Sequence, residues 1–517
     1  MKKIFSIILI LILAALALVA CNGQQPSSST ENSDSNVTYY VNGETTTASP
    51  DKGNYVVYAT LPDDASKWVS WDYDNWCVKN ADATTKYSVY FFSVDKLFAS
   101  AEALEAATDL TAGMKVGISS YHEGVGRGAS IYEIVTTEPE HRGKIEIEGS
   151  GAFASLIPFD VNGEKIITVD QFGAYGDGIK GDENRINRAF EYPNATVIEF
   201  ESTTYLQKNG IVLNHGNVYI NGKGATISNE YRAVNNIDFL IAGTIDNYLQ
   251  NIKVEYLTLN CTEETGEGAL SHQKDHNQLD AKYINGLTIK YCSFLVPYYE
   301  DVLDRHVTSV CIRTSDNTVF ENNTIKNLCG TTAYSGGLWF WGEELGGGKY
   351  TASNNISIKN NYIEKSSHDE TFAFFMGDFN DVVIQNNTIY SHDEPIGDAS
   401  AHAIGFGVHA IYTTMRNVDF SGNKVDVVAW ADAIVMANIE GMKIYDNEIN
   451  LRFNSPDQRI LYGVFRVAEP GLRTQTDVEI YNNTVKAYNT VNIPLTYSCD
   501  TGFNVHDNDY ECIIVKE

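Results

Sequence analysis

The chain has 517 residues, a formal net charge of −30 and a pI near 4.7. A protein this acidic is excluded as a nucleic-acid binder, because phosphate backbones are bound through Lys and Arg. The charge also disfavours a broad anionic ligand unless a metal ion or a local basic patch intervenes. The length is sufficient for two or three domains or for one long array of repeats.

The first twenty residues are typical of a secretory signal peptide. Lys2 and Lys3 precede an apolar run that ends at Leu18-Val19-Ala20, directly before Cys21. This end resembles the lipobox of bacterial lipoproteins, which implies cleavage before Cys21 and a lipid on its sulfur. A transmembrane anchor is the alternative for a run of this length, but the small residues before Cys21 and the polar residues after it favour the lipoprotein.

Residues 21–37 have almost no apolar content and predict a flexible tether. We therefore expect an extracytoplasmic protein, lipid-anchored at the bacterial cell surface or membrane, with no other contact to the bilayer. Apart from the lipid site, none of the cysteines shows a CxxC zinc spacing. The sequence thus leaves the metal of any site unknown.

Two small units are predicted before the main domain. In residues 38–105, the stretches VTYYVNG, NYVVYATL and YSVYFFSV indicate strands and DKLFASAEALEAA indicates a helix, which predicts a small β or α+β domain. Residues 106–165 contain LTAGMKVGISSYHEGVGRGASIYEIV, which resembles a small β module known from other proteins.

An Asn-containing repeat fills the second half of the chain. Segments such as TVFENNTI, VVIQNNTI and VEIYNNTV place an apolar residue three positions before an Asn. The repeated positions, 24 to 38 residues apart, are Cys292, Asn323, Asn361, Asn387, Asn423, Asn447, Asn483 and Asn508. Alternating apolar and polar residues indicate strands, and an Asn at the following corner tolerates left-handed backbone and can bond its counterparts along the axis. This predicts an all-β solenoid, a parallel β-helix, over residues 166–517.

Residues Val169–Tyr192 and the strand that follows them resemble a known family. Phe172-Gly173-Ala174, Gly176-Asp177-Gly178, and Gly222 with Gly224-Ala225-Thr226-Ile227 match the opening motif of the pectin-lyase-like superfamily, in its pectate-lyase and phage-tailspike branch. The resemblance covers roughly residues 106–517 and implies a right-handed parallel β-helix. For activity it is weak. In GDENRINRAF, Asp182 is placed to cap a helix whose Ile186, Ala189 and Phe190 form an apolar stripe that would close the open end of the solenoid.

Polar residues are predicted to form one column across successive coils. Equivalent positions of a β-helix stack about 4.8 Å apart, so residues far apart in sequence become neighbours. Counting back from the ladder positions, and aligning the longer coils by pattern, gives this set: Asp275 and His276; Arg305 and His306; Tyr334; His368, Asp369 and Glu370; His402; Trp430 and Asp432; Arg459 and Tyr462. A single Asp or Glu before a strand is usually a solvated turn residue, so the hypothesis depends on the column as a whole.

Insertions in the longer coils predict loops beside this column. The first opens with Leu338-Trp339-Phe340-Trp341, in which Trp339 and Trp341 are candidates for stacking on a sugar, with core or loop packing as an equal alternative. The predicted substrate-binding residues are therefore His368, Tyr334, Trp339, Trp341, Trp430 and Arg459.

The column suits glycoside hydrolysis. Asp369 and Asp432 are two coils apart, roughly 9–10 Å, close to the ~6.5–9.5 Å carboxylate separation of inverting glycosidases. Asp369 or Glu370 would act as the acid, and His306 and His402 would move protons or bind hydroxyl groups. Hydrolysis requires no cofactor. In a lyase, Arg305 or a His would instead abstract a proton beside a uronate carboxylate, and carboxylates would hold Ca²⁺.

The sequence departs from well-known enzymes of the fold. The Asn-Thr-Asp, Gly-His-Gly and Arg-Ile-Lys motifs of polygalacturonases are missing from the β-helix region, and Asp275-His276 keeps only the end of the Trp-Ile-Asp-His pattern of pectate lyases. Pectin is therefore not the predicted substrate. We expect a polysaccharide-cleaving enzyme, more readily a hydrolase than a Ca²⁺-dependent lyase, with a non-catalytic glycan-binding adhesin as the third possibility. The resemblance to tailspikes also allows a homotrimer.

Overall fold

The computed structural model describes residues 36–514 except for a set of short gaps. The gaps are residues 202, 230–236, 262–275, 300–306, 330–334, 347–348, 366–371, 392–401, 407–412, 429–431, 453–462, 468–474, 490–491 and 499–501. The predicted signal peptide and Cys21 lie outside the described residues. Among the described residues, no helix is long and apolar enough to cross a membrane.

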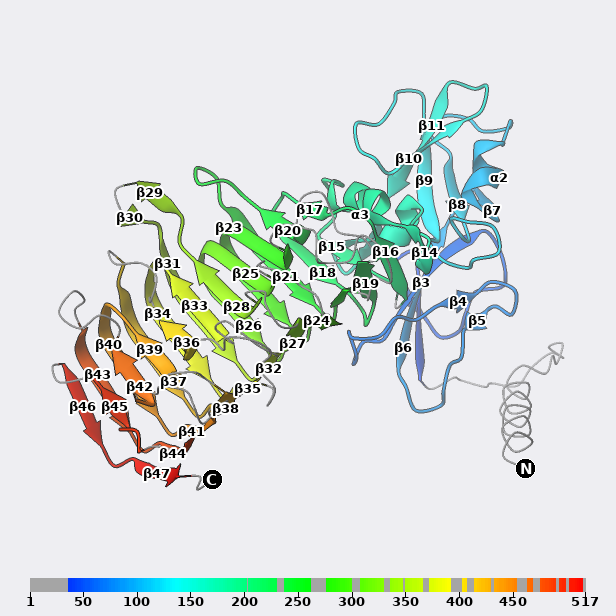
Figure 1. Cartoon of the computed structure of the whole chain (residues 1–517). Helices are drawn as coiled ribbons and strands as arrows, with labels where there is room; N and C mark the ends of the chain where they lie inside the picture. Colours follow the sequence, from blue (N-terminus) through cyan, green and yellow to red (C-terminus); the bar gives the residue numbers. More distant parts are fainter. Residues whose placement is uncertain are drawn as a thin grey trace.

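The chain begins with a four-stranded sheet in the order β2-β1-β6-β3 (Figure 1). Its strands, with a small hairpin beside them, are β1 (Val37–Val41), β2 (Glu44–Thr46), β3 (Tyr55–Thr60), β4 (Trp71–Asp72), β5 (Cys77–Val78) and β6 (Tyr87–Ser93). The three predicted strands correspond to β1, β3 and β6. Trp71, Trp76 and Phe91 pack edge-on or tilted within its core, with ring centroids 5.2–5.8 Å apart.

A second sheet follows in the order β10-β11-β9-β8-β7. Its elements are β7 (Lys96–Phe98), α2 (Ala101–Glu105), β8 (Lys115–Ile118), β9 (Ser130–Val135), β10 (Lys144–Ile147) and β11 (Ala152–Ile157). The helix predicted for residues 95–107 is therefore split, because Ser100 accepts a hydrogen bond from the Ala103 N–H and starts α2 only there. Strand pairing groups β7 with the second sheet, whereas the predicted boundary at residue 105 assigns it to the first unit.

Residues from 159 onward form a three-sided parallel β-helix, as predicted (Figure 1). Each coil crosses a first, a second and a third face in that order. The first face contains β17 (Ile211–Leu213), β20 (Ile237–Ala242), β23 (His276–Lys290), β25 (Val307–Asp316), β28 (Ser335–Trp341), β33 (Phe372–Met376), β36 (His402–Phe406), β39 (Asp432–Met436), β42 (Phe465–Val467) and β45 (Thr496–Tyr497).

The other two faces are also parallel, apart from one antiparallel pair at the start of the second face. The second face starts with the antiparallel pair β12 (Phe159–Val161) and β13 (Glu164–Thr168) and continues with β15 (Val197–Glu199), β18 (Val218–Asn221), β21 (Leu249–Glu255), the end of β23, β26 (Thr318–Glu321), β31 (Ala352–Lys359), β34 (Asp378–Gln385), β37 (Met415–Ser421), β40 (Ile439–Tyr445), β43 (Gln475–Tyr481) and β46 (Phe503–His506). The third face contains β14 (Asp177–Gly181), β16 (Thr204–Gln207), β19 (Thr226–Asn229), β22 (Thr258–Cys261), β24 (Ser293–Tyr299), β27 (Thr324–Cys329), β32 (Tyr362–Lys365), β35 (Thr388–Ser391), β38 (Lys424–Val428), β41 (Glu448–Arg452), β44 (Thr484–Asn489) and β47 (Asp509–Ile514).

The predicted asparagine ladder is confirmed at the corner between the second and third faces. The backbone N–H of Asn387 donates to Asn423 Oδ1 at 2.9 Å, and the Asn387 side-chain amide donates to the same oxygen at 3.0 Å. The pattern repeats at every described coil from Asn323 to Asn508, and Cys292 occupies the ladder position before Asn323. Amide side chains thus hydrogen-bond from coil to coil between Cys292 and Asn508.

The left-handed residue at this corner is the one before the ladder Asn, not the ladder Asn as predicted. Asn322, Asn360, Asn386, Gly422, Asp446, Asn482 and Asp507 all have φ between 54° and 64°. Asn, Asp and Gly adopt this conformation most readily. In the recurring Asn-Asn, Gly-Asn and Asp-Asn pairs, the first residue therefore forms the left-handed turn and the second forms the ladder.

A short helix, α3 (Glu183–Phe190), lies at the N-terminal end of the β-helix (Figure 1). It follows the 3-10 turn η1 (Val169–Phe172) in the chain. Ile186, Ala189 and Phe190 are buried in the main core, as the apolar stripe predicted. Asp182 stands at the N-cap, but its side chain makes no capping bond. Its carboxylate instead accepts hydrogen bonds from the N–H groups of Tyr175 and Gly176, at 2.7 and 3.1 Å, so it fixes the preceding turn.

Candidate functional site

The predicted column falls at the N-terminal ends of the first-face strands. His402 begins β36 and Asp432 begins β39, and the two are paired positions in adjacent parallel strands. His276 begins β23 and pairs with Val307, the first residue of β25. The remaining predicted members lie outside the described residues: Asp275, Arg305, His306, Tyr334, His368, Asp369, Glu370, Trp430, Arg459 and Tyr462. Of the backbone positions that can be compared, the structure therefore brings His402 and Asp432 together.

The strand order also fits the predicted spacing of two coils. Phe372 in β33 pairs with Ile404 in β36, which pairs with Ile434 in β39. Neighbouring strands are about 4.8 Å apart, so β33 and β39 are separated by roughly 10 Å.

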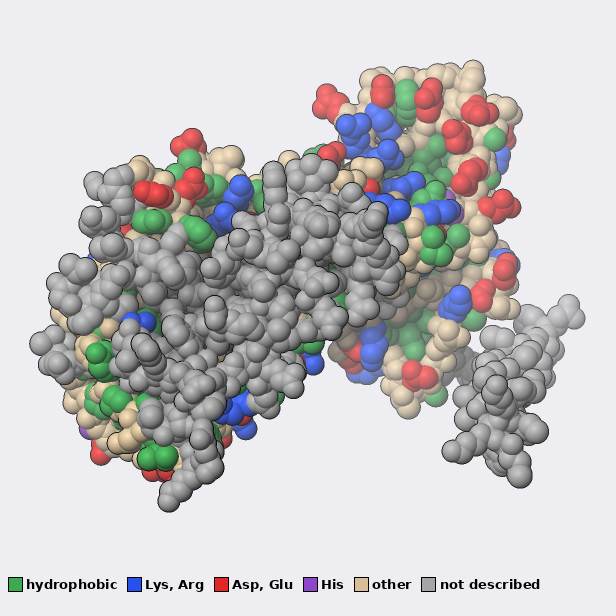
Figure 2. Space-filling view, in the orientation of Figure 1, with side chains coloured by type: hydrophobic (Ala, Val, Ile, Leu, Met, Phe, Trp, Pro, Cys, Tyr) green, Lys and Arg blue, Asp and Glu red, His purple; other side chains and the backbone are tan. Residues whose placement is uncertain are grey.

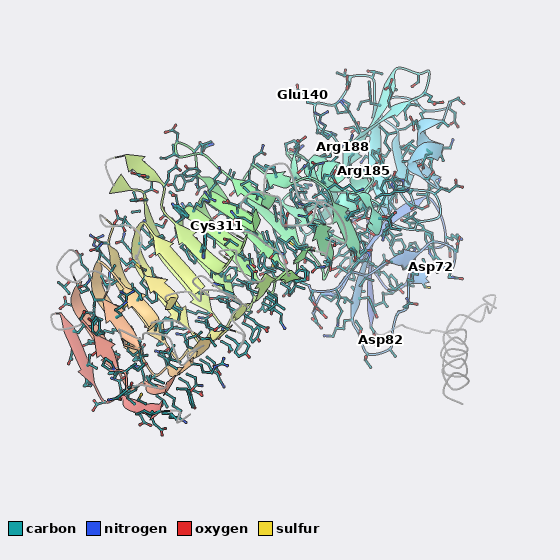
Figure 3. All side chains as sticks on the ribbon, viewed as in Figure 1. Asp72, Asp82, Glu140, Arg185, Arg188 and Cys311 are labelled. Atoms are coloured by element: carbon teal, nitrogen blue, oxygen red, sulfur yellow. The ribbon has the colours of Figure 1, made fainter. Side chains whose placement is uncertain are left out.

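The described outward side chains of the first face form a polar cluster on β23, β25 and β28. Leu279 and Val310 point into the core, so the alternate residues Asp280, Cys311 and Arg313 point outward. Asp280 pairs with Cys311, and Cys311 with Trp339. Cys311 is seen on β25, midway along the β-helix, in Figure 3.

Asp280 is the centre of this cluster and is only 2% exposed. Its Oδ2 accepts hydrogen bonds from Arg313 at 2.9 Å and from the side-chain amide of Asn277 at 3.0 Å. Burial raises the pKa of Asp280, and the Arg313 guanidinium opposes that shift. Its Oδ1 is buried and has no hydrogen-bond partner.

Trp339 and Trp341 lie in β28 itself, not at the opening of an insertion. Trp339 is buried against Cys311, with Trp341 packed beside them. Trp341 is half-buried, and the Arg313 guanidinium carbon is 5.8 Å from its ring centroid. The insertion after them folds into the hairpin β29 (Glu344–Gly346) and β30 (Lys349–Tyr350).

Asp280 and Arg313 were not predicted from the sequence. Asp280 and Cys311 each lie twelve residues before their ladder positions, Cys292 and Asn323, and Lys282 and Arg313 each lie ten before. The same counting that gave the column, applied inside the strands, would have found them.

Other features of the described residues lie away from this face. One hollow of about 550 Å³, near Trp68 and Asp82, is lined mainly by polar groups. Another of about 770 Å³, around Lys443 on the second face, has a mixed lining that includes Met442 and Phe503. Lys and Arg side chains gather near α3 (Figure 2), where Lys180 and Arg185 lie over the Tyr175 ring. Within the described part of the chain, no three His, Cys, Asp or Glu residues are arranged to hold a metal ion.

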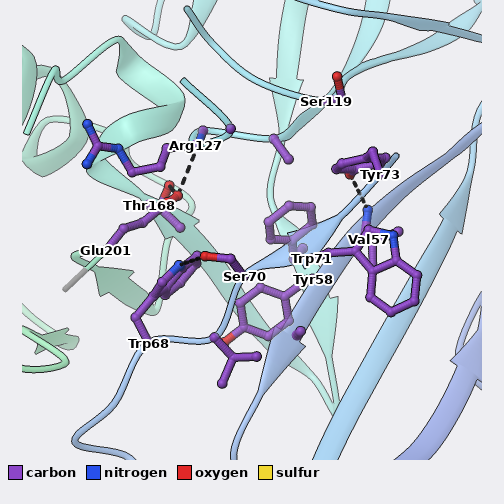
Figure 4. Close-up of a pocket in the computed structure, with 16 residues that line it drawn as sticks. Val57, Tyr58, Trp68, Ser70, Trp71, Tyr73, Ser119, Arg127, Thr168 and Glu201 are labelled. Carbon is purple, nitrogen blue, oxygen red and sulfur yellow. Dashed lines mark hydrogen bonds between the residues drawn. The ribbon is translucent and has the colours of Figure 1, made fainter. Parts of the chain in front are cut away.

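A small pocket of about 30 Å³ lies where the N-terminal sheet meets the β-helix (Figure 4). Glu201 beside it accepts a hydrogen bond from the Gly128 N–H at 3.1 Å. Nearby, Asp170 accepts one from the Tyr205 hydroxyl at 2.5 Å and faces Arg127 at 3.4 Å. Burial raises the pKa of Asp170 to about 7 and raises that of Glu201, which the neighbouring Asp170 charge raises further.

This pair predicts a pH dependence of stability. A carboxyl whose pKa is raised on folding stabilises the fold fully below its unfolded pKa, and this stability is lost as the pH rises through its folded pKa. For Asp170 the loss falls between about pH 4 and pH 7. Asp170→Asn is therefore expected to gain stability relative to the unmodified protein as the pH rises across that window. Urea unfolding at several pH values measures this, and parallel curves for the two proteins would contradict it.

Comparison with known proteins gives likenesses of structure only. No protein-family model matches the chain, and no curated protein matches it in sequence. A tailspike protein of Acinetobacter baumannii bacteriophage Fri1, a capsular polysaccharide depolymerase, is similar over 81% of this chain and 76% of its own, with 14% identity and a TM-score of 0.45. PfbA, a surface adhesin of Streptococcus pneumoniae, is similar over 67% of this chain and 89% of its own, with 14% identity and a TM-score of 0.40.

The enzymatically active domain of bacteriophage CBA120 tailspike protein 4 is also similar. It covers 80% of this chain and 52% of its own, with 12% identity and a TM-score of 0.38. None of these likenesses assigns an activity to this chain.

Proposed function

We propose that this protein is an extracytoplasmic, lipid-anchored enzyme that hydrolyses a polysaccharide along the first face of its β-helix. The observation that supports this most directly is the pairing of His402 with Asp432 in adjacent strands. Both residues belong to the polar column that the sequence predicts. An imidazole and a carboxylate at neighbouring positions are suited to proton transfer at a glycosidic bond.

In this proposal Asp369 or Glu370 protonates the leaving oxygen, and Asp432 activates water on the opposite side of the sugar. His306 and His402 bind hydroxyl groups or move protons, while Arg305, His368, Tyr334, Trp430 and Arg459 contact the polymer. The buried Asp280–Arg313 pair on the same face supports a polar binding surface beside the column. Anchoring through Cys21 and trimeric assembly stay predictions.

A polysaccharide panel tests the proposal. The full chain, in a detergent without sugar groups, is incubated with plant, algal, host and bacterial polysaccharides, with and without EDTA. Reducing ends and ultraviolet absorbance are followed together. We expect new reducing ends without absorbance and without loss in EDTA. Absorbance from a new double bond, lost in EDTA, would assign a Ca²⁺-dependent lyase instead. Retention of a glycan without any product would assign a binding protein.

A further inference from the structure

We propose that β23, β25 and β28 carry a separate subsite, in which Asp280 and Arg313 together bind two neighbouring hydroxyl groups of a neutral sugar unit. The ligand class rests on the proposed function, whereas the site itself rests on the contacts of the described residues. It lies in the strands, apart from the predicted column at their N-terminal ends.

Two unpartnered polar atoms belong to this ion pair. Asp280 Oδ1 and Arg313 Nε are both buried, and neither has a hydrogen-bond partner. Both side chains lie on the outward side of the adjacent strands β23 and β25. Gln278, two residues before Asp280, is held at the third face instead, where its side-chain amide donates to the Leu259 and Leu295 carbonyls at 3.2 and 2.9 Å. More than nine in ten buried polar groups in native proteins are paired, so two unpaired atoms on one ion pair indicate a place for a polar ligand.

The charges of the cluster select a neutral ligand. Arg313 and Asp280 already neutralise one another through the 2.9 Å contact at Oδ2. Two groups of this ion pair remain without a hydrogen-bond partner: the acceptor Asp280 Oδ1 and the donor Arg313 Nε. A pair of adjacent sugar hydroxyls can donate to the first and accept from the second. A carboxylated sugar would face the free oxygen of Asp280, and Lys282 is the one other cation that pairs with Arg313 in register.

Access and an apolar surface are also present. Although its Nε is buried, the Arg313 side chain is 41% exposed, so a ligand can reach it. Trp341 is half-buried beside the guanidinium. Sugar sites commonly combine such an aromatic surface with a few directed polar groups.

The distance to the predicted column defines the length of the ligand. From β25 the first face continues through β28 and β33 to β36 and β39. These three and four strand steps amount to about 14–19 Å. A single sugar unit cannot contact both places, so the subsite acts on an oligosaccharide or polymer that runs along the β-helix axis.

Affinity electrophoresis of the full chain tests this. The probes are neutral polymers (dextran, galactomannan, mixed-linkage glucan, xylan) and acidic ones (alginate, hyaluronate, polygalacturonate). Arg313→Ala and Asp280→Asn are expected to weaken binding to the retained neutral polymer by roughly tenfold to a hundredfold. Trp341→Ala leaves the ion pair intact and is also expected to weaken binding to the neutral polymer. It tests the subsite if the other two variants do not fold.

Arg416→Ala is the matched control. Arg416 is also 41% exposed and also forms an ion pair, with Glu440 at 2.7 Å, but it lies on the second face. We expect it to bind as the unmodified protein does. Unchanged binding in the folded Arg313, Asp280 and Trp341 variants would overturn the subsite, as would preference for the acidic polymers.

Two further outcomes separate the subsite from the proposed function. Neutral-polymer binding that depends on Arg313, without any cleavage, supports the subsite and removes the hydrolase. Cleavage of a polymer whose binding is indifferent to Arg313 keeps the hydrolase and overturns the subsite. A chain that binds none of the polymers overturns both.

Discussion

Replacing Asp432 by Asn is expected to lower the turnover number on a cleaved polysaccharide by at least about a hundredfold. Asparagine has the same shape but cannot accept a proton, so water activation would be lost while the strand is kept. Because Asp432 is the first residue of β39 and Asn has nearly the same size, we expect little change in stability. The KM should change far less than the turnover number, since a role confined to proton transfer does not contribute to ground-state binding.

Initial rates of reducing-end release measure this, and Asp509→Asn is the control. Asp509 also opens its strand, β47, but is exposed on the third face. We expect it to retain full activity. A folded Asp432→Asn protein with unchanged turnover would exclude Asp432 as the base. If Asp369→Asn and Glu370→Gln were also fully active, the hydrolytic mechanism itself would be contradicted.

The fold could be predicted because each coil contains an apolar residue at a fixed distance from a ladder Asn. An apolar residue three positions before Asn323 or Asn387 points into the core, and the Asn itself satisfies buried backbone groups of the adjacent coils. What the pattern could not separate was the turn from the ladder. Both positions favour Asn, and only the backbone angles show that Asn322 and Asn386 carry the left-handed turn.

The site was less accessible to sequence reasoning. Counting from the ladder identifies the strand ends and predicts that His402 and Asp432 are neighbours, but that column does not include residues inside the strands. Outward residues on a β-strand are ordinarily solvated, and the residue pattern does not show that Asp280 is almost completely buried. Burial of an outward side chain depends on what else packs against the sheet, which is a tertiary property.

Local rules also failed where a stronger partner was available. Asp182 has the sequence context of a helix cap, yet its carboxylate accepts from two N–H groups of the preceding turn instead. Trp339 and Trp341 have the composition of a sugar platform, yet their place in β28 packs Trp339 against Cys311. In both cases the residue type has the chemistry that the prediction requires, but in the structure the side chain contacts a different partner.

Replacing Asn387 by Ala is expected to destabilise the β-helix by about 3–5 kcal/mol. Asn387 is 1% exposed. Its side chain donates to Ile358 O and to Asn423 Oδ1, both at 3.0 Å, and accepts from the Asn361 N–H, also at 3.0 Å. Truncation would leave the Ile358 carbonyl and the Asn361 N–H buried without these partners, at about 1–3 kcal/mol each.

Urea unfolding followed by circular dichroism measures the loss, with Asn508→Ala as the comparison. Asn508 belongs to the same ladder and accepts from the Asn483 N–H at 3.0 Å, but it stands in the last described coil and is partly exposed. Water can replace its bonds, so we expect a loss of only about 1 kcal/mol. Since neighbouring coils stabilise one another in a solenoid, the interior change should also make unfolding less cooperative. Equal losses of unfolding free energy at the two positions would contradict this reasoning. They would show that burial of the backbone groups does not determine how much a ladder Asn contributes.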